Sequence, residues 1–398
     1  MKKTLFIFGT TYNQIPLVEK AKASGYMTVC LGTGGGVCEK YADKVYPIDF
    51  TDIEEVLRLA KIYQPAGMVT CGTSTAIHAI AQCNHLLKFS DKVPPLQVVE
   101  NCVFKNRYRD IIGESMAPGF SASDPEKAVE MVQTLRLPVV VKPADGGGGK
   151  GISLLEKVSL QQMQDAFQHA RSYSKMNTVV VEEFIDGTVL GVESFVHDGK
   201  IFTLVMPEKL IDEEVMNLTR GVVFPANFSA EIADQIRRVN EAAIRAFGIN
   251  WGAVHIDMIL ERNEVPRIID VGPRLAGGPL MAEMVPRYYN YDFYKATIQL
   301  SVGEQPLPVP DQHDNQYYAS YSLVPDKDGI LESVEYEAEA VDACRVFFYR
   351  QLLADGSSVK SPKSDGDRVV LFASTGENYQ QTLSHVMSFA SGIRMKIR

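Results

Sequence analysis

The feature that most constrains the fold is an alternation of short apolar runs with amphipathic stretches at the start of the chain. The apolar runs stand at 4–8, 27–31, 45–48 and 67–70, and the helix-like stretches between them lie at 15–23 and 52–63. Strands joined by helices pair in parallel, because each helix returns the chain to the end at which the preceding strand began. We therefore expect residues 1–100 to form an α/β domain with a parallel sheet, ending soon after Pro94 and Pro95.

Strand signals become stronger after residue 101. Segments rich in β-branched residues lie at 137–141, 179–183, 201–206, 253–260 and 267–271. The proline-rich stretch QPLPVP at 305–310 then indicates a stiff linker. Beyond the linker, further strands are expected at 317–323, 344–349 and 368–372, and a closing helix at 378–390. This last part predicts a small α+β unit, so the expected domains are 1–100, 101–310 and 311–398.

Net charge, hydropathy and cysteine spacing exclude several classes of function. The chain has 40 Lys and Arg against 49 Asp and Glu, and its net charge of -9 repels a phosphate backbone at long range. No stretch has the ~18 apolar residues of a membrane-spanning helix, and Met1 to Lys3 lead directly into a strand-like run. The six cysteines form no Cys-x-x-Cys pair, which argues against a zinc site. We expect a cytoplasmic protein that binds neither nucleic acid nor a membrane.

The most unusual local feature is the segment KPADGGGGKG at 142–151, which directly follows an apolar run. It holds five glycines within residues 146–151, together with Lys142 and Lys150. Glycine-rich backbone can turn several amides toward one anion, and the lysines supply positive charge, so the segment suits a triphosphate. Its spacing differs from the Walker A loop and from the dinucleotide fingerprint. A flexible hairpin tip is the alternative that the glycines alone leave open.

A second segment, VVVEEFIDG at 179–187, is a predicted strand that ends in the carboxylates of Glu182 and Glu183. Glu193 follows on the next apolar run. Beside a nucleotide, such a strand offers backbone groups to an adenine and a carboxylate to the ribose hydroxyls. Taken alone, a Glu-Glu pair is more typical of a solvated strand edge.

A third pair of segments places acidic residues on two neighbouring strands. His255-x-Asp257 lies on one strand, and Asp270 stands near the end of the next strand, followed by Arg274. Carboxylates that project from adjacent antiparallel strands can meet on one face and provide the hard oxygen ligands that Mg²⁺ prefers. Arg274 could then reach a phosphate. An ion-paired hairpin with a hydrogen-bonded, structural His255 is the alternative.

Taken in this order, the three segments resemble the ATP-grasp ligases. The resemblance extends over most of the chain and includes ADKVYPID at 42–49 in the first domain. It implies an ATP-grasp fold that combines α/β and α+β parts: an N-terminal parallel-sheet domain, a two-lobed ATP-binding centre and a small C-terminal α+β domain. The glycine-rich segment would act as a lid on a lobe at about 115–190.

The resemblance also implies roles for individual positions. Lys105 and Lys142 would contact phosphates, covered by Gly147, Gly148, Gly149, Lys150 and Gly151. The hinge that meets adenine would be Glu182, Glu183, Phe184 and Ile185, and Glu193 would bind ribose. Asp257 and Asp270 would hold magnesium, Arg274 would steady the transferred phosphoryl group, and His255 would lie near the acceptor as a neutral imidazole. One departure concerns the metal. The family usually has Glu-x-Asn-Pro-Arg where this chain has DVGPR, so Asp270 is the shorter carboxylate and Gly272 replaces the asparagine ligand.

These roles describe an ATP-dependent ligase with ATP and Mg²⁺ as cofactors, the metal being one or two ions that Mn²⁺ could replace. The run RLAGG at 274–278 is most similar to carboxylate-amine ligases of the amino-acid or dipeptide type, which make an acyl phosphate, release ADP and join the acyl group to an amine. The expected partners are small-molecule carboxylates and amines and, by family resemblance, a second copy in a homodimer. Two alternatives stay open: a carboxylase-type enzyme that activates bicarbonate, and a non-catalytic ATP-binding module with a degenerate metal site.

Overall fold

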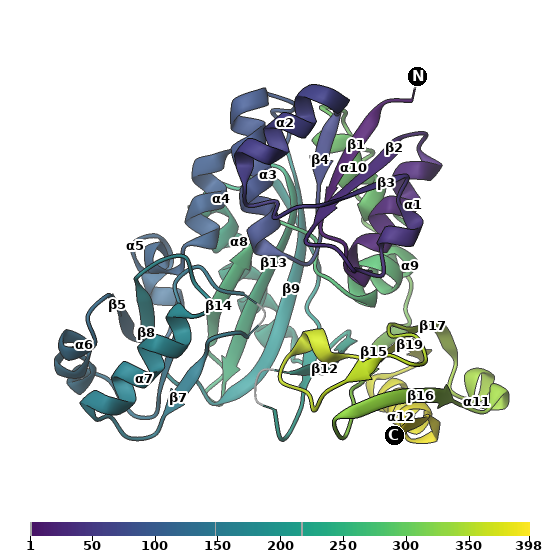
Figure 1. Cartoon of the computed structure of the whole chain (residues 1–398). Helices are drawn as coiled ribbons and strands as arrows, with labels where there is room; N and C mark the ends of the chain where they lie inside the picture. Colours follow the sequence, from purple (N-terminus) through teal and green to yellow (C-terminus); the bar gives the residue numbers. More distant parts are fainter. Residues whose placement is uncertain (1, 148, 216–217) are drawn as a thin grey trace.

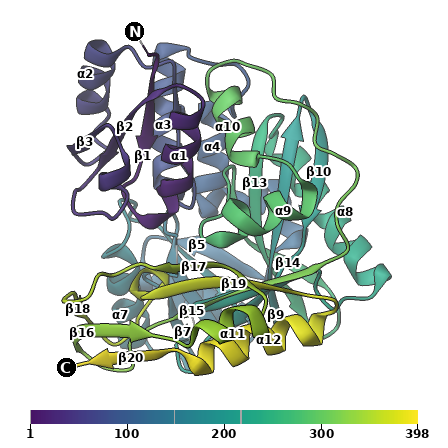
Figure 2. The same ribbon diagram turned by 90° about the vertical axis from the view of Figure 1, so that its right-hand side faces the viewer.

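The computed structural model describes residues 2–147, 149–215 and 218–398. Its strands form four sheets. Figure 1 shows the N-terminal sheet at the top, a small lobe at the lower left and the C-terminal part at the lower right, with long strands running between them. The two ends of the chain lie at opposite ends of the molecule in both views (Figures 1 and 2).

The N-terminal part is a four-stranded parallel sheet covered by helices, as the alternation predicts. Its elements are β1 (Thr4–Phe8), α1 (Ile15–Ala23), β2 (Met27–Gly32), β3 (Lys44–Pro47), α2 (Ile53–Tyr63), β4 (Gly67–Val69), α3 (Ser74–Leu87) and α4 (Leu96–Val103), with the strand order β3-β2-β1-β4. Side chains of β1 alternate between two layers. Leu5 and Ile7 pack with α1, whereas Phe6 and Phe8 pack with α2 and α3.

The small lobe is built on a four-stranded antiparallel sheet. Its elements are α5 (Tyr108–Ile112), β5 (Gly119–Ala122), α6 (Pro125–Met131), β6 (Val139–Pro143), β7 (Ser153–Leu155), α7 (Leu160–Arg171) and β8 (Val179–Glu183), with the strand order β5-β8-β6-β7. Phe167 on α7 packs on the sheet with Val139 and Val181. The glycine-rich segment is the connection between β6 and β7. β6 begins at Val139, two residues later than the sequence predicts, because Pro138 has no N–H to donate to a neighbouring strand.

A larger antiparallel sheet lies at the centre of the molecule. It contains β9 (Gly187–His197), β10 (Lys200–Val205), β11 (Glu208–Ile211), β12 (Thr219–Phe224), β13 (Gly252–Glu261) and β14 (Pro266–Gly272), and it is crossed by α8 (Ala230–Phe247). The strand order is β14-β13-β9-β11-β12, with β10 paired to β9. Ile236 and Ile244 of α8 pack against Val254 and Ile256 of β13. The residues of β13 that alternate with these, including Asp257, therefore face away from α8.

The C-terminal part continues the central sheet. Its elements are the π-helix η6 (Leu280–Met284), α9 (Val285–Tyr289), α10 (Phe293–Ser301), β15 (Tyr317–Leu323), β16 (Gly329–Glu335), α11 (Ala338–Ala343), β17 (Val346–Gln351), β18 (Ser358–Val359), β19 (Val370–Gly376), α12 (Tyr379–Gly392) and β20 (Arg394–Ile397). β15 pairs with β12, and β19 and β17 follow in order, so one nine-stranded sheet crosses the domain boundary predicted at residue 310. Figure 2 shows β15, β19 and β17 above α12. β16, β18 and β20 form a separate small sheet, and the three-domain division stays a prediction.

Helix α10 returns to the N-terminal sheet from far along the chain. Ile298 and Leu300 lie in the same apolar cluster as Leu5 and Ile7, and the Ser90 hydroxyl donates to the Leu300 carbonyl at 2.6 Å. No local pattern in the sequence predicts that α10 packs on this sheet. Within the described ranges, no helix combines the length and the apolar character needed to cross a bilayer. All six cysteines are free and buried.

The hydroxyl of Tyr108 on α5 holds β14 next to Asp270. Tyr108 is fully buried, and its oxygen accepts from the Val271 N–H at 2.9 Å and donates to the Cys102 carbonyl at 2.5 Å. We expect Tyr108→Phe to lower the free energy of unfolding by about 1–3 kcal/mol, because buried backbone groups lose their partner. Urea unfolding measures this loss. Tyr173→Phe, at a side chain 52% exposed, should change it by less than ~0.5 kcal/mol. Equal losses in both variants would contradict the assignment.

Candidate functional site

Two aspartates face each other on neighbouring strands of the central sheet. Asp257 on β13 is the register partner of Asp270 on β14, so both side chains leave the sheet on the face opposite α8. Their side chains are 20% and 18% exposed. The register shifts immediately after Asp257, where the pairing is irregular. Like charges directly opposite each other repel, so such a pair requires compensating cations nearby.

Lys105 connects Asp270 to the glycine-rich segment. Its Nζ lies 2.6 Å from Asp270 Oδ1 and donates to the Gly146 carbonyl at 2.7 Å. Its backbone N–H donates to the Ala144 carbonyl, also at 2.7 Å. One side chain therefore contacts both a candidate metal carboxylate and the candidate phosphate-binding segment.

The backbone of the glycine-rich segment requires glycine at several positions. Gly149 and Gly151 have φ values of 73° and 72°, a conformation that other residues rarely adopt. A Cβ on Gly146 would come within 2.8 Å of the Cβ of Pro143. The predicted residue Gly148 lies outside the described residues. Glycine at these positions therefore follows from backbone geometry and close packing.

Asp145 ties the glycine-rich segment to the small lobe. Its carboxylate accepts from the Ser174 hydroxyl and, at 3.1 Å, from the Lys175 N–H. Gly147 and Lys150 are exposed. The segment is thus anchored at its start, while these two predicted phosphate-covering residues face solvent.

Lys142 forms a buried ion pair with Glu182 in the small lobe. Lys142 Nζ lies 2.5 Å from Glu182 Oε2, and Arg109 donates to the other carboxylate oxygen at 3.1 Å. Lys142 is 7% and Glu182 is 4% exposed. The backbone of Glu182 pairs with both β5 and β6. The carboxylate of Glu182 is therefore engaged within the lobe, where it orients Lys142, and its predicted contact with adenine stays a prediction.

The hinge between β8 and β9 leaves few groups free for a ligand. The Glu183 carboxylate accepts from the backbone N–H and the Nε of Arg136, each at 2.9 Å. Burial alone would raise the pKa of Glu183, but these hydrogen bonds outweigh it and lower that pKa. The Phe184 N–H donates to the Pro138 carbonyl at 2.9 Å. The Ile185 N–H has no partner among the residues that the structure describes, so it and the half-exposed Phe184 ring are the groups that a base could meet.

His255 lies between two carboxylates. Its Nδ1 is 2.6 Å from Glu193 Oε1, and its Nε2 is 2.9 Å from Asp257 Oδ1. Burial opposes the charged imidazole, but the two carboxylates outweigh it and raise the pKa of His255 to about 9. The two carboxylates therefore favour the charged imidazole over the neutral form expected from the sequence. Both ring nitrogens are engaged, so His255 fixes Asp257 in place instead of accepting a proton from a substrate.

Glu193 lies far from the hinge that was expected to hold the base. Glu193 is the register partner of His255, whereas Gly187, at the hinge end of β9, is the register partner of Glu261. Six residues of strand separate Glu193 from Gly187, a distance of about 20 Å. Glu193 is 1% exposed. The predicted ribose contact stays a prediction that this position does not favour, and Glu193 belongs to the aspartate cluster.

Lys209 is a site residue that the sequence analysis missed. It lies on β11, and its Nζ is 2.5 Å from Asp257 Oδ1. Burial opposes ionisation of Asp257, but Lys209 and His255 hold the pKa of that carboxyl well below its usual range. Gly191 makes room beneath these groups, because a Cβ there would lie 3.2 Å from the His255 ring and 3.7 Å from Lys209 Cε. The sequence carries no local signal for Lys209, whose position depends on the β9–β11 pairing.

Arg274 folds back beside Gly272. A Cβ on Gly272 would lie 3.3 Å from Arg274 Cζ and 3.3 Å from its Nε. The Nη1 donates to the Leu275 carbonyl at 3.3 Å, and the buried Nε has no partner among the described residues. The guanidinium therefore retains donors that an incoming anion could use.

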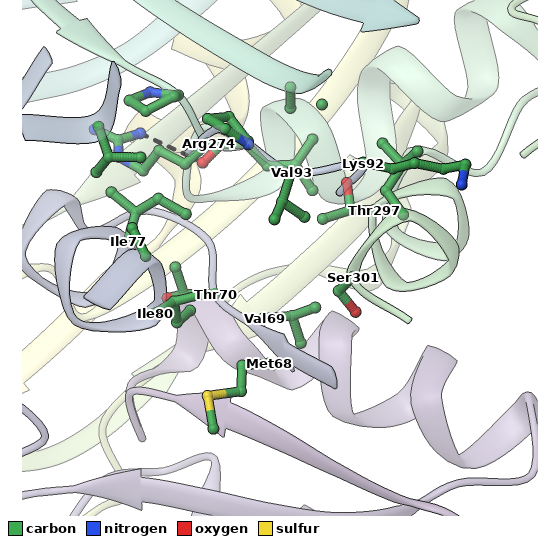
Figure 3. Close-up of a pocket in the computed structure, with 18 residues that line it drawn as sticks. Met68, Val69, Thr70, Ile77, Ile80, Lys92, Val93, Arg274, Thr297 and Ser301 are labelled. Atoms are coloured by element: carbon green, nitrogen blue, oxygen red, sulfur yellow. Dashed lines mark hydrogen bonds between the residues drawn. The ribbon is translucent and has the colours of Figure 1, made fainter. Parts of the chain in front are cut away.

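Arg274 also lines an apolar cavity of about 50 Å³ between β4, α3 and α10 (Figure 3). The hydroxyls at its wall are already paired: Thr70 donates to the Phe8 carbonyl at 2.8 Å, and Ser301 to the Ile298 carbonyl at 2.7 Å. Such a cavity offers little to a charged ligand. The candidate site is therefore the aspartate cluster with the glycine-rich segment.

The donor set suits a divalent cation that is completed by its ligand. Among the residues that the structure describes, no group of three or more His, Cys, Asp or Glu side chains is arranged to hold a metal. Mg²⁺ in nucleotide sites is usually held by one or two carboxylates together with phosphates. Asp257 and Asp270 fit that pattern, and a preformed cage is not required.

Comparisons with known proteins bear on the same region. Residues 117–278 match the family described as an ATP-grasp domain. Among curated proteins, the uncharacterized protein y4rH of Sinorhizobium fredii is 25% identical over 309 residues, which cover 73% of this chain and 61% of the relative. The chain thus spans about three fifths of that relative's length.

Solved structures match the whole chain. L-amino acid ligase from Bacillus licheniformis has a TM-score of 0.82 at 18% identity, with 100% of this chain and 99% of that one covered. The biotin carboxylase domain of Hydrogenobacter thermophilus 2-oxoglutarate carboxylase, in complex with MgADP and bicarbonate, has a TM-score of 0.80 at 16% identity, with 100% and 91% covered. At these identities the likeness is one of fold.

The buried Lys142–Glu182 pair gives a test of the small lobe. Lys142→Met leaves Glu182 with Arg109 as its one cationic partner among the described residues. We therefore expect a loss of roughly 2–3 kcal/mol in the free energy of unfolding, below the ~3–5 kcal/mol typical of breaking a buried pair. Adding Glu182→Gln to this variant should restore most of the loss. Urea unfolding again measures the change. Lys44→Met, which removes an exposed amine from Tyr63, is the control and should cost nearly nothing; a comparable loss there would refute the argument.

Proposed function

The chain has the ATP-grasp fold and carries an ATP-grasp domain at residues 117–278, and from that premise we propose that it is an ATP-dependent ligase. It converts a substrate carboxylate into an acyl phosphate, with ADP as the leaving product. An amine then attacks the acyl carbon, and an amide bond forms as phosphate leaves. The substrates are small molecules, of the amino-acid or dipeptide type.

One observation carries this proposal. Lys105 contacts Asp270 at 2.6 Å and Gly146 at 2.7 Å, and Asp270 is the register partner of Asp257. Candidate metal ligands, a candidate phosphate-binding lysine and the glycine-rich segment therefore converge at one place. Each of these three features has an ordinary structural explanation alone, and their convergence favours a triphosphate site.

The chemistry requires cations, because a carboxylate and a triphosphate repel each other before they can react. Lys105, Lys142 and Arg274 supply positive charge around the reacting groups. A magnesium ion held by Asp257 and Asp270 would polarise the phosphoryl oxygens. The glycine-rich segment covers the phosphates and excludes water, which would otherwise hydrolyse the acyl phosphate.

The geometry around Gly272 favours a single metal ion. The space that a side chain at position 272 would occupy is taken by Arg274, whose Cζ lies 3.3 Å from the Cβ position. An asparagine ligand could fit there only if Arg274 moved. We therefore propose that the guanidinium supplies the charge that a second ion provides in two-metal sites.

A carboxylase-type reaction on bicarbonate is the second candidate, since the matched biotin carboxylase domain was solved with bicarbonate. A phosphate-release assay with paired amino acids, and with bicarbonate in separate wells, distinguishes the two. Phosphate release that requires both a carboxylate and an amine supports the ligase. Release with bicarbonate and no amino acid selects the carboxylase, and tight ATP binding without turnover on any substrate leaves the non-catalytic module.

The two aspartates provide the first test of the proposed function. We expect Asp257→Asn and Asp270→Asn each to lower ADP formation at least ~100-fold, equivalent to about 2.7 kcal/mol of transition-state stabilisation, while circular dichroism shows that both variants stay folded at the assay temperature. Coupled spectrophotometric detection of ADP measures the rate. Asp234→Asn, at an exposed carboxylate on α8, is the matched control and should retain wild-type turnover. Wild-type turnover in either site variant would contradict the assignment.

Arg274 provides the second test. Because its guanidinium meets the transferred group and not the nucleotide base, Arg274→Ala should leave ATP affinity within ~3-fold of wild type and lower product formation ~100-fold. Calorimetry gives the affinity and chromatography gives the product. Arg237→Ala, an exposed arginine on α8, is the control. A collapse of nucleotide affinity in Arg274→Ala would show that the residue positions the nucleotide instead.

A further inference from the structure

Both carboxylates proposed to bind the metal already carry protein cations. Asp257 Oδ1 lies 2.5 Å from Lys209 Nζ and 2.9 Å from His255 Nε2, and Asp270 Oδ1 lies 2.6 Å from Lys105 Nζ. These are short, charge-assisted contacts at side chains that are no more than 20% exposed. A divalent cation that binds these carboxylates would stand beside the two ammonium groups, whose positive charges repel it.

We propose that Lys105 and Lys209 are stand-ins for the divalent cation. In the metal-free protein they neutralise Asp270 and Asp257, and they leave these carboxylates when the metal arrives with the nucleotide. This inference rests on the proposed function, because it assumes that the two aspartates bind the metal.

The lysines can move, whereas His255 cannot. A lysine carries its charge at the end of a flexible four-carbon stem, and Lys209 and Lys105 are 17% and 11% exposed. His255 is held at both ring nitrogens, by Glu193 and by Asp257, and is 7% exposed. Asp257 therefore keeps one partner throughout, and only its ammonium partner is exchanged.

The charges explain why the exchange depends on the nucleotide. Two carboxylates and two ammonium groups balance in the metal-free site. A divalent ion alone would displace the ammonium groups and leave them without partners, so its binding is weak. A triphosphate supplies new anionic partners for both lysines, so metal and nucleotide bind together more tightly than either binds alone. Lys105 also donates to the Gly146 carbonyl, so its movement would change a contact of the glycine-rich segment as well.

Manganese binding without nucleotide tests the proposal directly. We expect Lys209→Gln to bind Mn²⁺ about tenfold more tightly than the wild type, because a competing positive charge has gone. Lys105→Gln should act in the same direction. Lys209→Arg keeps the charge and should bind Mn²⁺ as weakly as the wild type. Electron paramagnetic resonance of free Mn²⁺, titrated against the full chain, measures these affinities.

Two further variants complete the experiment. Lys200→Gln removes an exposed lysine of β10, on the strand next to β9, and should leave Mn²⁺ binding unchanged. Asp257→Asn should abolish Mn²⁺ binding. Because His255 still holds Asp257 when Lys209 is replaced, Lys209→Gln should stay folded at the assay temperature, which circular dichroism checks.

The outcomes separate this inference from the proposed function. Unchanged Mn²⁺ binding in Asp257→Asn would refute the metal site itself. Loss of binding in Asp257→Asn, together with unchanged or weaker binding in Lys209→Gln, would leave the metal site standing and overturn the role of the lysines. Tighter binding in Lys209→Gln but not in Lys209→Arg, together with lower ADP formation in Lys209→Gln, supports the exchange.

Discussion

The pairing of β13 with β14 is the constraint on which the site depends. Its register places Asp257 opposite Asp270 on the face away from α8, and two carboxylates so close are unfavourable unless cations surround them. Three side chains from different elements supply positive charge beside the aspartates: Lys105 from the turn after α4, Lys209 from β11, and His255 from β13 itself. A shift of one residue in this pairing would send one aspartate into the apolar layer beneath α8, so the register is fixed by the core as well as by the site.

Most of the fold could be predicted from local patterns. The strands of the first domain and the helix at 53–63 follow from apolar periodicity, and the Asp52 side chain caps that helix as its position suggests. Contacts between segments far apart in the chain could not be predicted in this way. β15 joins β12 across the proline-rich stretch, and α10 covers a sheet formed some 200 residues earlier, as the Ser90–Leu300 hydrogen bond illustrates. Neither contact can be predicted from the local sequence, because each depends on which surfaces of the sheets are left uncovered by the rest of the chain.

For the candidate site too, local patterns predict some features but not those that depend on distant strands. The opposition of Asp257 and Asp270 could be predicted, since both stand on recognisable strands joined by a short turn. The contact of Glu193 with His255 could not be predicted, because it depends on the pairing of β9 with β13, which places Glu193 about 20 Å from the hinge. Lys209 was missed because it reaches Asp257 through strands that are not consecutive in the chain. The sequence pattern therefore predicts the two aspartates, which stand on adjacent strands, but it does not predict the lysine that balances the charge of Asp257.

The nine-stranded sheet has a consequence for how the chain can be divided. Residues 317–323 supply the partner for β12, with a register that runs from Gly221 opposite Tyr321 to Phe224 opposite Tyr318. A shortened chain that stopped in the proline-rich stretch would expose the N–H and C=O groups along that side of β12. An open edge of this kind invites pairing with other chains and aggregation. The part that carries Asp257 and Asp270 therefore depends on the last quarter of the protein for its solubility, even though none of the candidate site residues lies there.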